Sequence, residues 1–150
     1  MITYRQANTA DGAEVVSLLA DIMQHHGVAV PDAASLDSVV RSALDSPYHS
    51  FLLAENEGAA AGMCALVFTY STWSAALVCE LQDVIVREAA RRSSVGRGLI
   101  LAAERVARER GCARLFLLAE YWNLEAHAFY RSLGLTEKTS LYFERDLSGC

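Results

Sequence analysis

The spacing of apolar residues predicts alternating strands and helices along the chain. Apolar side chains recur every three or four positions in several segments, which is typical of helices that bury one face. The predicted helices cover residues 11–27, 36–44, 96–110 and 124–133. Short apolar or alternating runs predict strands at residues 2–6, 50–54, 62–70, 75–86, 113–119 and 141–146. The predicted order is β α α β β β α β α β, which is an α/β arrangement.

Capping and turn residues stand at the ends of these segments. Thr9 or Asp11 is the expected N-cap of the first helix, where Glu14 would complete a capping box with Asp11. Gly111 is the expected C-terminal cap of the third helix. Residues 55–58, which end in glycine, predict a hairpin turn between two strands.

Length and composition indicate a single globular domain. The chain has 150 residues, of which 53% are hydrophobic, and it contains two prolines and no repeat or low-complexity linker. A chain of this length can bury one core, so we expect residues 1–150 to form one domain. The N-terminal residues have no apolar signal core, and no apolar run approaches the roughly 20 residues that span a bilayer. A cytoplasmic protein is therefore expected.

Charge and cysteine content narrow the classes of partner. The net charge of −5 argues against nucleic-acid binding through a broad basic face. Cys64, Cys79 and Cys112 lie in apolar segments, and with Cys150 they are widely spaced, as small hydrophobes in a reducing compartment would be. Because the sequence has no CxxC and no His/Cys pair at ligand spacing, no metal is expected.

Residues 91–98 predict an anion-binding turn. The segment follows the apolar run 84–86 and opens a helix, so unpaired amides and the positive end of the helix dipole point into the turn. Gly96 and Gly98 would let backbone approach a ligand, and three arginines would supply charge for more than one phosphate. A solvated arginine run at a helix start is the alternative interpretation.

Two motifs together resemble the GNAT superfamily of acyl-CoA N-acyltransferases. One is Arg91-x-x-Ser94-x-Gly96 at a helix start, and the other runs from Asn123 to Tyr130 on the next helix. The resemblance covers nearly the whole chain. It implies a mixed central β-sheet that is splayed at the cofactor cleft, with helices on both faces. Within the superfamily, residues 68–73 and 81–83 are similar to strand motifs of diamine and polyamine acetyltransferases.

The chain departs from the family pattern at two positions. Ser94 stands where the loop has its first glycine, so a positive φ at this position would be strained, although the backbone N–H remains. Gln82 stands where the polyamine enzymes carry a carboxylate, and an amide cannot take up a proton. The first departure bears on cofactor affinity and the second on the identity of the acceptor.

The resemblance implies acetyl coenzyme A as co-substrate. Its pyrophosphate would be held by amides at the helix start, and its pantetheine arm would lie along the preceding strand as an added strand would. An N–H near Val84 would face the thioester carbonyl. The expected cofactor-binding residues are Val84, Ile85, Val86, Arg91, Arg92, Ser93, Ser94, Val95, Gly96, Arg97, Asn123 and Ala126.

Two residues are candidates for proton transfer. By resemblance, Tyr130 is the general acid that protonates the departing thiolate, since a phenol pKa of about 10 lies near a thiol pKa of about 8.5. Packing against Phe129 is the alternative role. Glu80 is a candidate base or water-holding residue, because strand alternation places it on the face of Gln82 and Val84 unless a bulge intervenes.

The residues expected to bind the acceptor come from separate segments. His26 follows the first helix in the region that covers the acceptor site in this superfamily, where a histidine can act as base or simply favour the helix dipole. Asp83 has a structural alternative, and His49 is expected to be a surface or packing residue. The expected substrate-binding residues are His26, Gln82, Asp83 and Glu120.

These features predict an N-acetyltransferase that acts by direct attack of a primary amine on acetyl coenzyme A. The acceptor would be a small molecule resembling a polyamine, an amino acid or an aminoglycoside. One alternative is acetylation of a protein N-terminus or lysine, and another is a catalytically weak acyl-CoA-binding module. Apolar and aromatic residues in 67–77 and 141–143 predict a homodimer, with no nucleic-acid or membrane partner.

Overall fold

The computed structural model describes residues 1–149. It divides the chain into two compact units, one formed by Met1–Leu118 and the other by the residues from Ala119 onward. The first unit holds all the strands and three of the four α-helices of the described residues.

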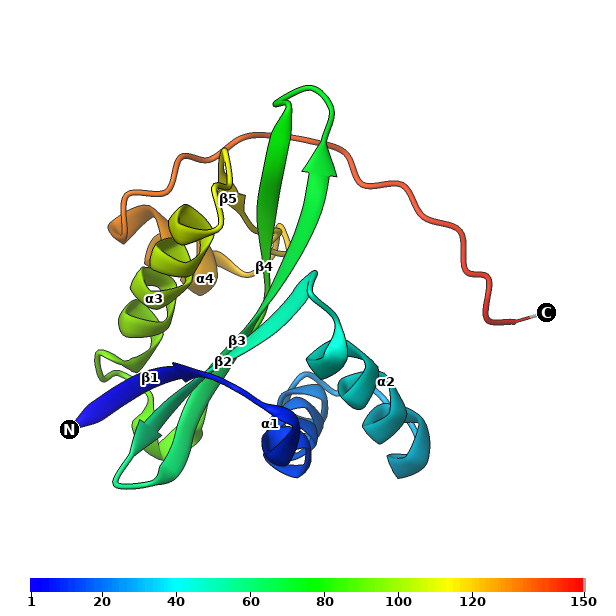
Figure 1. Cartoon of the computed structure of the whole chain (residues 1–150), viewed down its shortest axis with the longest axis vertical. Coiled ribbons are helices and arrows are strands. Elements are labelled where there is room, and N and C mark those ends of the chain that lie inside the picture. Colours follow the sequence, from blue (N-terminus) through cyan, green and yellow to red (C-terminus); the bar gives the residue numbers. More distant parts are fainter. Residues whose placement is uncertain (150) are drawn as a thin grey trace. The chain divides into compact units, whose positions relative to one another are not determined.

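The first unit is built on a five-stranded mixed sheet (Figure 1). Its strand order follows the chain, with antiparallel pairing from β1 to β4 and parallel pairing between β4 and β5. The strands are β1 (Ile2–Gln6), β2 (His49–Asn56), β3 (Ala59–Ser71), β4 (Ala76–Val86) and β5 (Leu115–Phe116). The long central hairpin turns through Glu57 and Gly58, whose positive φ angles of 52° and 81° match the turn expected at residues 55–58.

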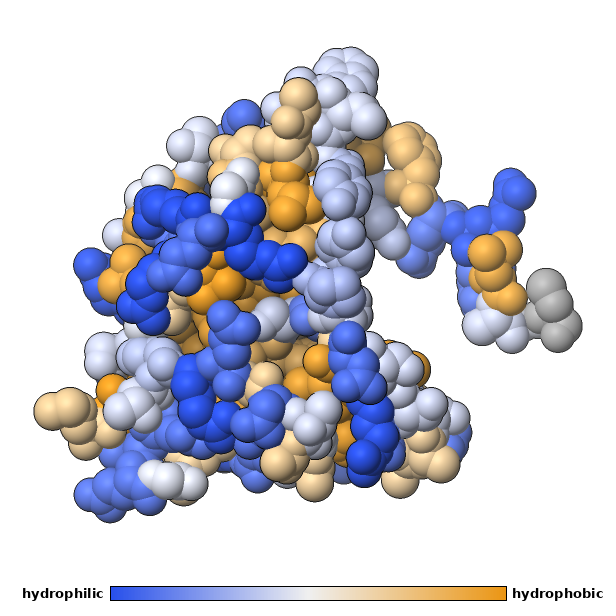
Figure 2. All heavy atoms as spheres, in the orientation of Figure 1, coloured by the Kyte–Doolittle hydropathy of each residue, from blue (hydrophilic) through white to orange (hydrophobic). Residues whose placement is uncertain are grey.

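Helices cover both faces of this sheet (Figure 1). On one face lie α1 (Gly12–His25) and α2 (Ala33–Asp45), and on the other lies α3 (Val95–Glu109). The buried residues between the first pair and the sheet are Val15, Leu18, Leu19, Leu36, Val40, Phe51, Leu53, Met63, Ala65 and Ile85. Hydrophilic side chains gather over the outer face of α3, as its amphipathic pattern predicts (Figure 2). The predicted fold class, an α/β layered chain with a mixed sheet, is confirmed.

The expected strand at residues 113–119 is much shorter than predicted. Only Leu115 and Phe116 pair with β4, opposite Cys79 and Glu80, and both are half-buried. Within residues 1–149, the edge of β4 from Leu81 to Val86 has no ladder partner on the β5 side. An apolar run becomes a strand only as far as its neighbour stays within hydrogen-bonding distance, and here the two strands part after two residues. This parting is the predicted splay of the sheet.

The second unit contains α4 (Leu124–Ser132). Asn123 Oδ1 accepts a hydrogen bond from the Ala126 N–H at 3.2 Å, which confirms the predicted N-cap. The predicted strand at residues 141–146 is wrong. Leu141 and Phe143 alternate as a strand face would, but they are 80% and 85% exposed, and no described residue pairs with this segment as a ladder. Alternation alone does not make a strand, because the strand exists only through its hydrogen-bonded partner.

The predicted capping box of Asp11 and Glu14 is wrong, and the box lies three residues earlier in the chain. The box joins Asn8 to Asp11 at a 3₁₀ turn (Thr9–Asp11), and Asp11 then precedes α1 without capping it through its side chain. The Asp11 carboxylate is held by the Arg5 guanidinium at 2.8 Å, which lowers the pKa of Asp11 to about 2. Because Arg5 and the Asn8 N–H occupy this carboxylate, it is not available to the amides of α1.

Gly62 on β3 packs too closely to accept a side chain. A Cβ here would lie 2.5 Å from the Ile85 carbonyl oxygen and 3.2 Å from Val95 Cγ1. Because the nearest atom is backbone, we expect Gly62→Ala to lower the free energy of unfolding by about 1–3 kcal/mol, as overpacked cores do. Urea denaturation measures this loss. Gly12→Ala is the control, since its Cβ would meet Leu44 Cδ1 at 3.8 Å, and an equal loss in both variants would contradict the packing argument.

Cys64 and Cys79 are buried free thiols, and burial raises the pKa of each to about 12. Cys112 is a half-buried free thiol, and burial raises its pKa as well. Cys150 lies outside the described residues. Among residues 1–149, none of the helices has the length and apolar character needed to cross a membrane.

Candidate functional site

A β-bulge interrupts β4 at Asp83 and Val84. Gln82 pairs with Ala65 and Ile85 pairs with Met63, so two residues of β4 stand opposite one residue of β3. Asp83 has a φ of 50°, a left-handed conformation that a bulge can impose on a non-glycine residue. The bulge therefore changes which side chains share a face beyond this point.

The bulge corrects the expected grouping of Glu80 with Gln82 and Val84. Gln82 and Ile85 face the α1–α2 side, because each pairs with a β3 residue of that core. Glu80, two residues before Gln82, shares this face. Val84 does not share it, since the extra residue reverses the alternation. Glu80 and Gln82 thus remain together as acceptor-side candidates.

The same register decides which peptide groups point out of the sheet. The Arg87 N–H donates to the Ala61 carbonyl of β3 at 2.9 Å. In an antiparallel ladder the peptide groups of successive residues point to opposite sides of the strand, so those of Ile85, two residues earlier, also point toward β3. The peptide groups of Val84 and Val86 therefore point toward the side where β4 has no strand partner. Of the three residues expected to contact the pantetheine arm, these two have outward peptide groups.

The loop before α3 has its strained residue at an unexpected position. Arg92 has a φ of 59°, whereas Ser94 has a φ of −78° and is unstrained. The Ser93 hydroxyl donates to the Ala90 carbonyl and accepts from the Val95 N–H at 3.4 Å. Serine in place of the family's first glycine therefore causes no backbone strain in this loop.

The N-terminus of α3 has the donor groups of an anion site. Ser94 precedes the helix without capping it through its side chain. The amides of Gly96 and Arg97 have no carbonyl one turn earlier within the helix. Exposed arginines surround these amides, and Arg91 is anchored by Nε donation to the Val86 carbonyl at 3.1 Å. The arrangement supplies both fixed dipoles and mobile positive charge to an anionic ligand.

Gly98 has a packing role instead of the expected ligand-approach role. A Cβ at this position would lie 1.8 Å from the Tyr4 hydroxyl oxygen and 2.1 Å from Tyr4 Cζ. Tyr4 Oη in turn lies 3.5 Å from the Ser94 carbonyl, to which it donates. The ring of Tyr4 therefore occupies the space beside α3, and the glycine allows this close contact.

Arg87 connects the end of β4 to α1. Its Nε donates to the Ala60 carbonyl at 3.0 Å, and its two terminal nitrogens contact Asp21 at 2.6 Å and Glu14 at 2.8 Å. Both carboxylates belong to α1. This half-buried guanidinium fixes the strand end from which the loop before α3 begins.

His49 is the polar residue of this sheet face that sequence reasoning missed. It begins β2 opposite Val67, which itself pairs with Glu80, so all three lie in one cross-strand row. Burial lowers the pKa of His49, while the nearby Asp83 carboxylate opposes this shift. Burial raises the pKa of Asp83, and His49 opposes that shift. The available signal was the alternation of His49 with Phe51 on the core side of β2.

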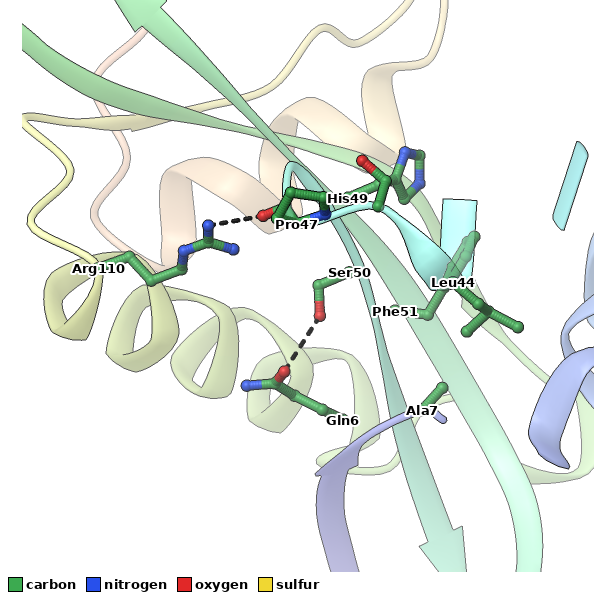
Figure 3. A pocket seen from close by; sticks show the side chains of 9 residues that line it. Gln6, Ala7, Leu44, Pro47, His49, Ser50, Phe51 and Arg110 are labelled. Carbon is green, nitrogen blue, oxygen red and sulfur yellow. Dashed lines mark hydrogen bonds between the residues drawn. The ribbon is translucent and has the colours of Figure 1, made fainter. Parts of the chain in front are cut away.

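A cavity of about 200 Å³ lies beside the start of β2, and His49, Ser50 and Phe51 are among the residues that line it (Figure 3). Ser50 donates to Gln6 Oε1 at 3.4 Å, and Arg110 donates to the Pro47 carbonyl at 2.6 Å. The Arg110 guanidinium also lies 4.0 Å from the centre of the Phe68 ring. None of the predicted site residues lines this cavity.

The remaining candidates lie apart from the β4 site or in the second unit. His26 is exposed at the C-terminal end of α1. In the second unit, the Glu120 carbonyl lies 2.8 Å from Nε2 of His127, and the half-buried Tyr130 ring packs 5.2 Å from that of Phe129. Among residues 1–149, no three His, Cys, Asp or Glu side chains gather as a metal site requires.

Comparison with known proteins gives a family match and several relatives. The model of the acetyltransferase (GNAT) family matches residues 13–135. The uncharacterized N-acetyltransferase YhfO of Bacillus subtilis is 29% identical over 138 residues, covering 92% of each chain. Thialysine N-epsilon-acetyltransferase of Bos taurus is 24% identical over 147 residues, covering 92% of this chain and 86% of the relative.

The fold is shared with solved acetyltransferase structures. An aminoglycoside acetyltransferase from an uncultured soil metagenomic sample superposes with a TM-score of 0.85. The alignment covers 98% of this chain and 97% of that chain, at 19% sequence identity. At this identity the likeness concerns the fold alone.

Proposed function

The chain belongs to the acetyltransferase (GNAT) family, and we propose that it transfers an acetyl group from acetyl coenzyme A to a primary amine of a small molecule by direct attack. The observation that carries this proposal is the sequence of features along β4 and α3. A strand edge with outward peptide groups leads directly into uncapped helix amides surrounded by arginines. Few other ligands combine an amide-bearing arm with a pyrophosphate in this order.

The residues present fit coenzyme A. The pyrophosphate would be held by the α3 amides from Val95 to Arg97, with charge from Arg91 and Arg92. The amide-bearing arm would take hydrogen bonds from the peptide groups of Val84 and Val86. Acetyl coenzyme A supplies the activated acyl group as a thioester. Asn123 and Ala126 are proposed as further contacts, in addition to the cap bond that joins them.

The proton-transfer roles are assigned to groups of suitable chemistry. Tyr130 Oη is proposed to donate its proton to the departing thiolate. The Val84 N–H is proposed to stabilise the oxygen on which negative charge develops, a contribution of about 3–4 kcal/mol in related oxyanion sites. Glu80 is proposed to take the proton that an ammonium must lose, directly or through water.

A small acceptor is proposed, bound near Gln82 and Asp83 with His26 and Glu120 as further candidates. The thialysine-acetylating relative acts on a small amine, which supports this class. Gln82 favours an amino-acid-like amine over a polyamine, because an amide offers a hydrogen bond but no negative charge. Acetylation of a protein amine is the second candidate function, which the negative net charge of −5 favours through attraction of basic peptides.

The proposed function is tested by a panel of acceptors with release of free coenzyme A as the readout. The panel contains thialysine, lysine, spermidine, an aminoglycoside and a lysine-containing peptide. We expect turnover with at least one small amine and less with the peptide. Turnover with the peptide alone would contradict the small-molecule proposal and support protein acetylation. Binding of acetyl coenzyme A without turnover on any amine would leave a binding module.

A homodimer is proposed from exposed apolar surface in both units. Tyr70 and Trp73 are 73% and 100% exposed at the end of the β3–β4 hairpin. In the second unit, Leu141 and Phe143 are exposed to a similar degree. Because single chains rarely expose so many large apolar side chains, we expect light scattering to give twice the chain mass of 16.4 kDa at micromolar concentration. A mass of one chain at that concentration would contradict the dimer.

We also propose a domain organisation and a cellular compartment. Residues 1–150 are proposed to act as a single acetyltransferase domain, since the family model extends across both compact units. The cytoplasm is the proposed compartment, because buried free cysteines such as Cys64 suit a reducing environment.

A further inference from the structure

Nε2 of His49 is a buried atom for which the described residues supply no hydrogen-bond partner. It is the one side-chain nitrogen or oxygen within residues 1–149 in this condition. Buried polar atoms in folded proteins are almost always paired, since an unpaired one lowers the stability of the fold. The structure therefore has a hydrogen-bonding position that something outside the described residues can fill.

The position of His49 connects this atom to the proposed acetyl-transfer site. His49, Val67 and Glu80 form one row across β2, β3 and β4, with their side chains on the same face. Neighbouring strands lie about 4.8 Å apart, so His49 and Glu80 stand about 10 Å apart across the row. The His49 side chain also lines the cavity of Figure 3, where its imidazole lies on the opposite side of β2 from the Ser50 side chain. The imidazole thus belongs to the face of Glu80 and Gln82.

The surroundings of His49 favour a neutral ring beside negative charge. Its ring centre lies 4.9 Å from that of Phe51, and burial lowers the pKa of the imidazole. Asp83, at the bulge of β4, is the carboxylic group that interacts with the imidazole, and Glu80 lies in the same cross-strand row. A neutral imidazole with its proton on Nδ1 presents Nε2 as an acceptor of hydrogen bonds.

We propose that Nε2 of His49 accepts a hydrogen bond from the amine substrate and so places the attacking nitrogen over the sheet face that carries Glu80. The inference rests on the proposed function, amine acetylation. An amine N–H is the donor that Nε2 lacks. The carboxylates of Glu80 and Asp83 attract the ammonium form of the same substrate. The anionic groups of coenzyme A are proposed to bind elsewhere, at the N-terminus of α3.

Kinetics on the best acceptor of the panel give the first test. His49→Phe keeps a ring against Phe51 and removes the nitrogen, so we expect KM for the amine to rise about 10- to 100-fold, as for a lost hydrogen bond to a charged group. The melting temperature should stay equal or rise, because the unpaired buried atom is gone. His49→Gln should keep most of the affinity through its amide oxygen. His25→Gln, at an exposed position of α1, is the matched control.

Binding without acetyl coenzyme A gives a test that does not depend on turnover. Nitrogen NMR of histidine-labelled protein is recorded while n-butylamine is added. We expect the Nε2 resonance of His49 to shift with saturation, and the resonances of His25 to stay in place. An unshifted His49 resonance at saturating amine, or a His49→Phe KM within twofold of wild type, would overturn the inference and leave Nε2 to a buried water. Failure of every amine in turnover, with the NMR shift present, would instead count against the proposed function.

Discussion

Replacing Tyr130 with phenylalanine is expected to lower the turnover number by about 10²- to 10⁴-fold, the span that loss of a general acid produces. The substitution keeps the ring that packs against Phe129 and removes the hydroxyl group with the proton that it could donate. The free energy of unfolding should therefore change little. Coenzyme A release on the best acceptor, measured from pH 6 to 10 beside the wild type, checks the turnover.

The matched control for this substitution is Tyr121→Phe, in which the same hydroxyl is removed from an exposed position of the second unit. We expect wild-type turnover in the control and an unchanged affinity for acetyl coenzyme A in both variants. Equal turnover in Tyr130→Phe and Tyr121→Phe would return Tyr130 to a packing role. A loss of folding in Tyr130→Phe would show that its hydroxyl is structural.

Gly96→Trp is expected to abolish the protection that acetyl coenzyme A gives against thermal unfolding. A ligand at 100 times its Kd stabilises a folded protein by about 2.7 kcal/mol, which appears as a clear rise in melting temperature. The indole at Gly96 would fill the space in front of the first amides of α3, where the pyrophosphate is proposed to lie. Scanning calorimetry with and without millimolar acetyl coenzyme A measures the shift.

Arg105→Trp carries the same new side chain on an exposed position of the same helix, and it should retain the full ligand-induced rise. Circular dichroism at low temperature confirms that both variants are folded before the ligand is added. Full protection of Gly96→Trp by acetyl coenzyme A would contradict the placement of the pyrophosphate at α3. A wild type that no acyl coenzyme A protects would contradict the cofactor itself.

Features that depend on local residue chemistry could be predicted from the sequence. The amphipathic pattern of residues 96–110, followed by Gly111, gave α3 to within one residue at each end. Gly111 has a φ of 75°, as a C-terminal helix cap requires. The turn at Glu57 and Gly58 likewise follows from residues that tolerate positive φ. In each case the determining residues are neighbours in the chain.

Features that depend on pairing between distant segments could not be predicted in this way. The bulge at Asp83 is defined by its register against Met63 and Ala65, which no periodicity within β4 reveals. The segment 141–146 has a strand-like pattern but no partner strand in the described residues. The role of Asp11 was decided by Arg5, which reaches it from β1. Local sequence patterns indicate which helices and strands can form, and contacts between distant segments determine which of them do form.

The same distinction between local and long-range features applies to the residues of the candidate site. The loop at residues 91–98 could be proposed as an anion site because its amides and arginines are contiguous in sequence. The cross-strand row of His49 and Glu80 was missed because it arises only when β2, β3 and β4 pair. The close contact of Gly98 with Tyr4 could not be predicted, because Tyr4 is 94 positions away in the chain.

The buried cysteines bear on the proposed use of a thioester as co-substrate. Thiol–thioester exchange proceeds through the thiolate, and a free thiol with a pKa near 8.5 is a few per cent ionised at neutral pH. With pKa values of about 12, Cys64 and Cys79 have thiolate fractions of about 10⁻⁵ at pH 7. These two side chains are therefore poor targets for self-acylation and for the aromatic disulfide reagents that report released coenzyme A. If acetyl coenzyme A is the co-substrate as proposed, the thiols of the central strands are expected to take no acyl group from it.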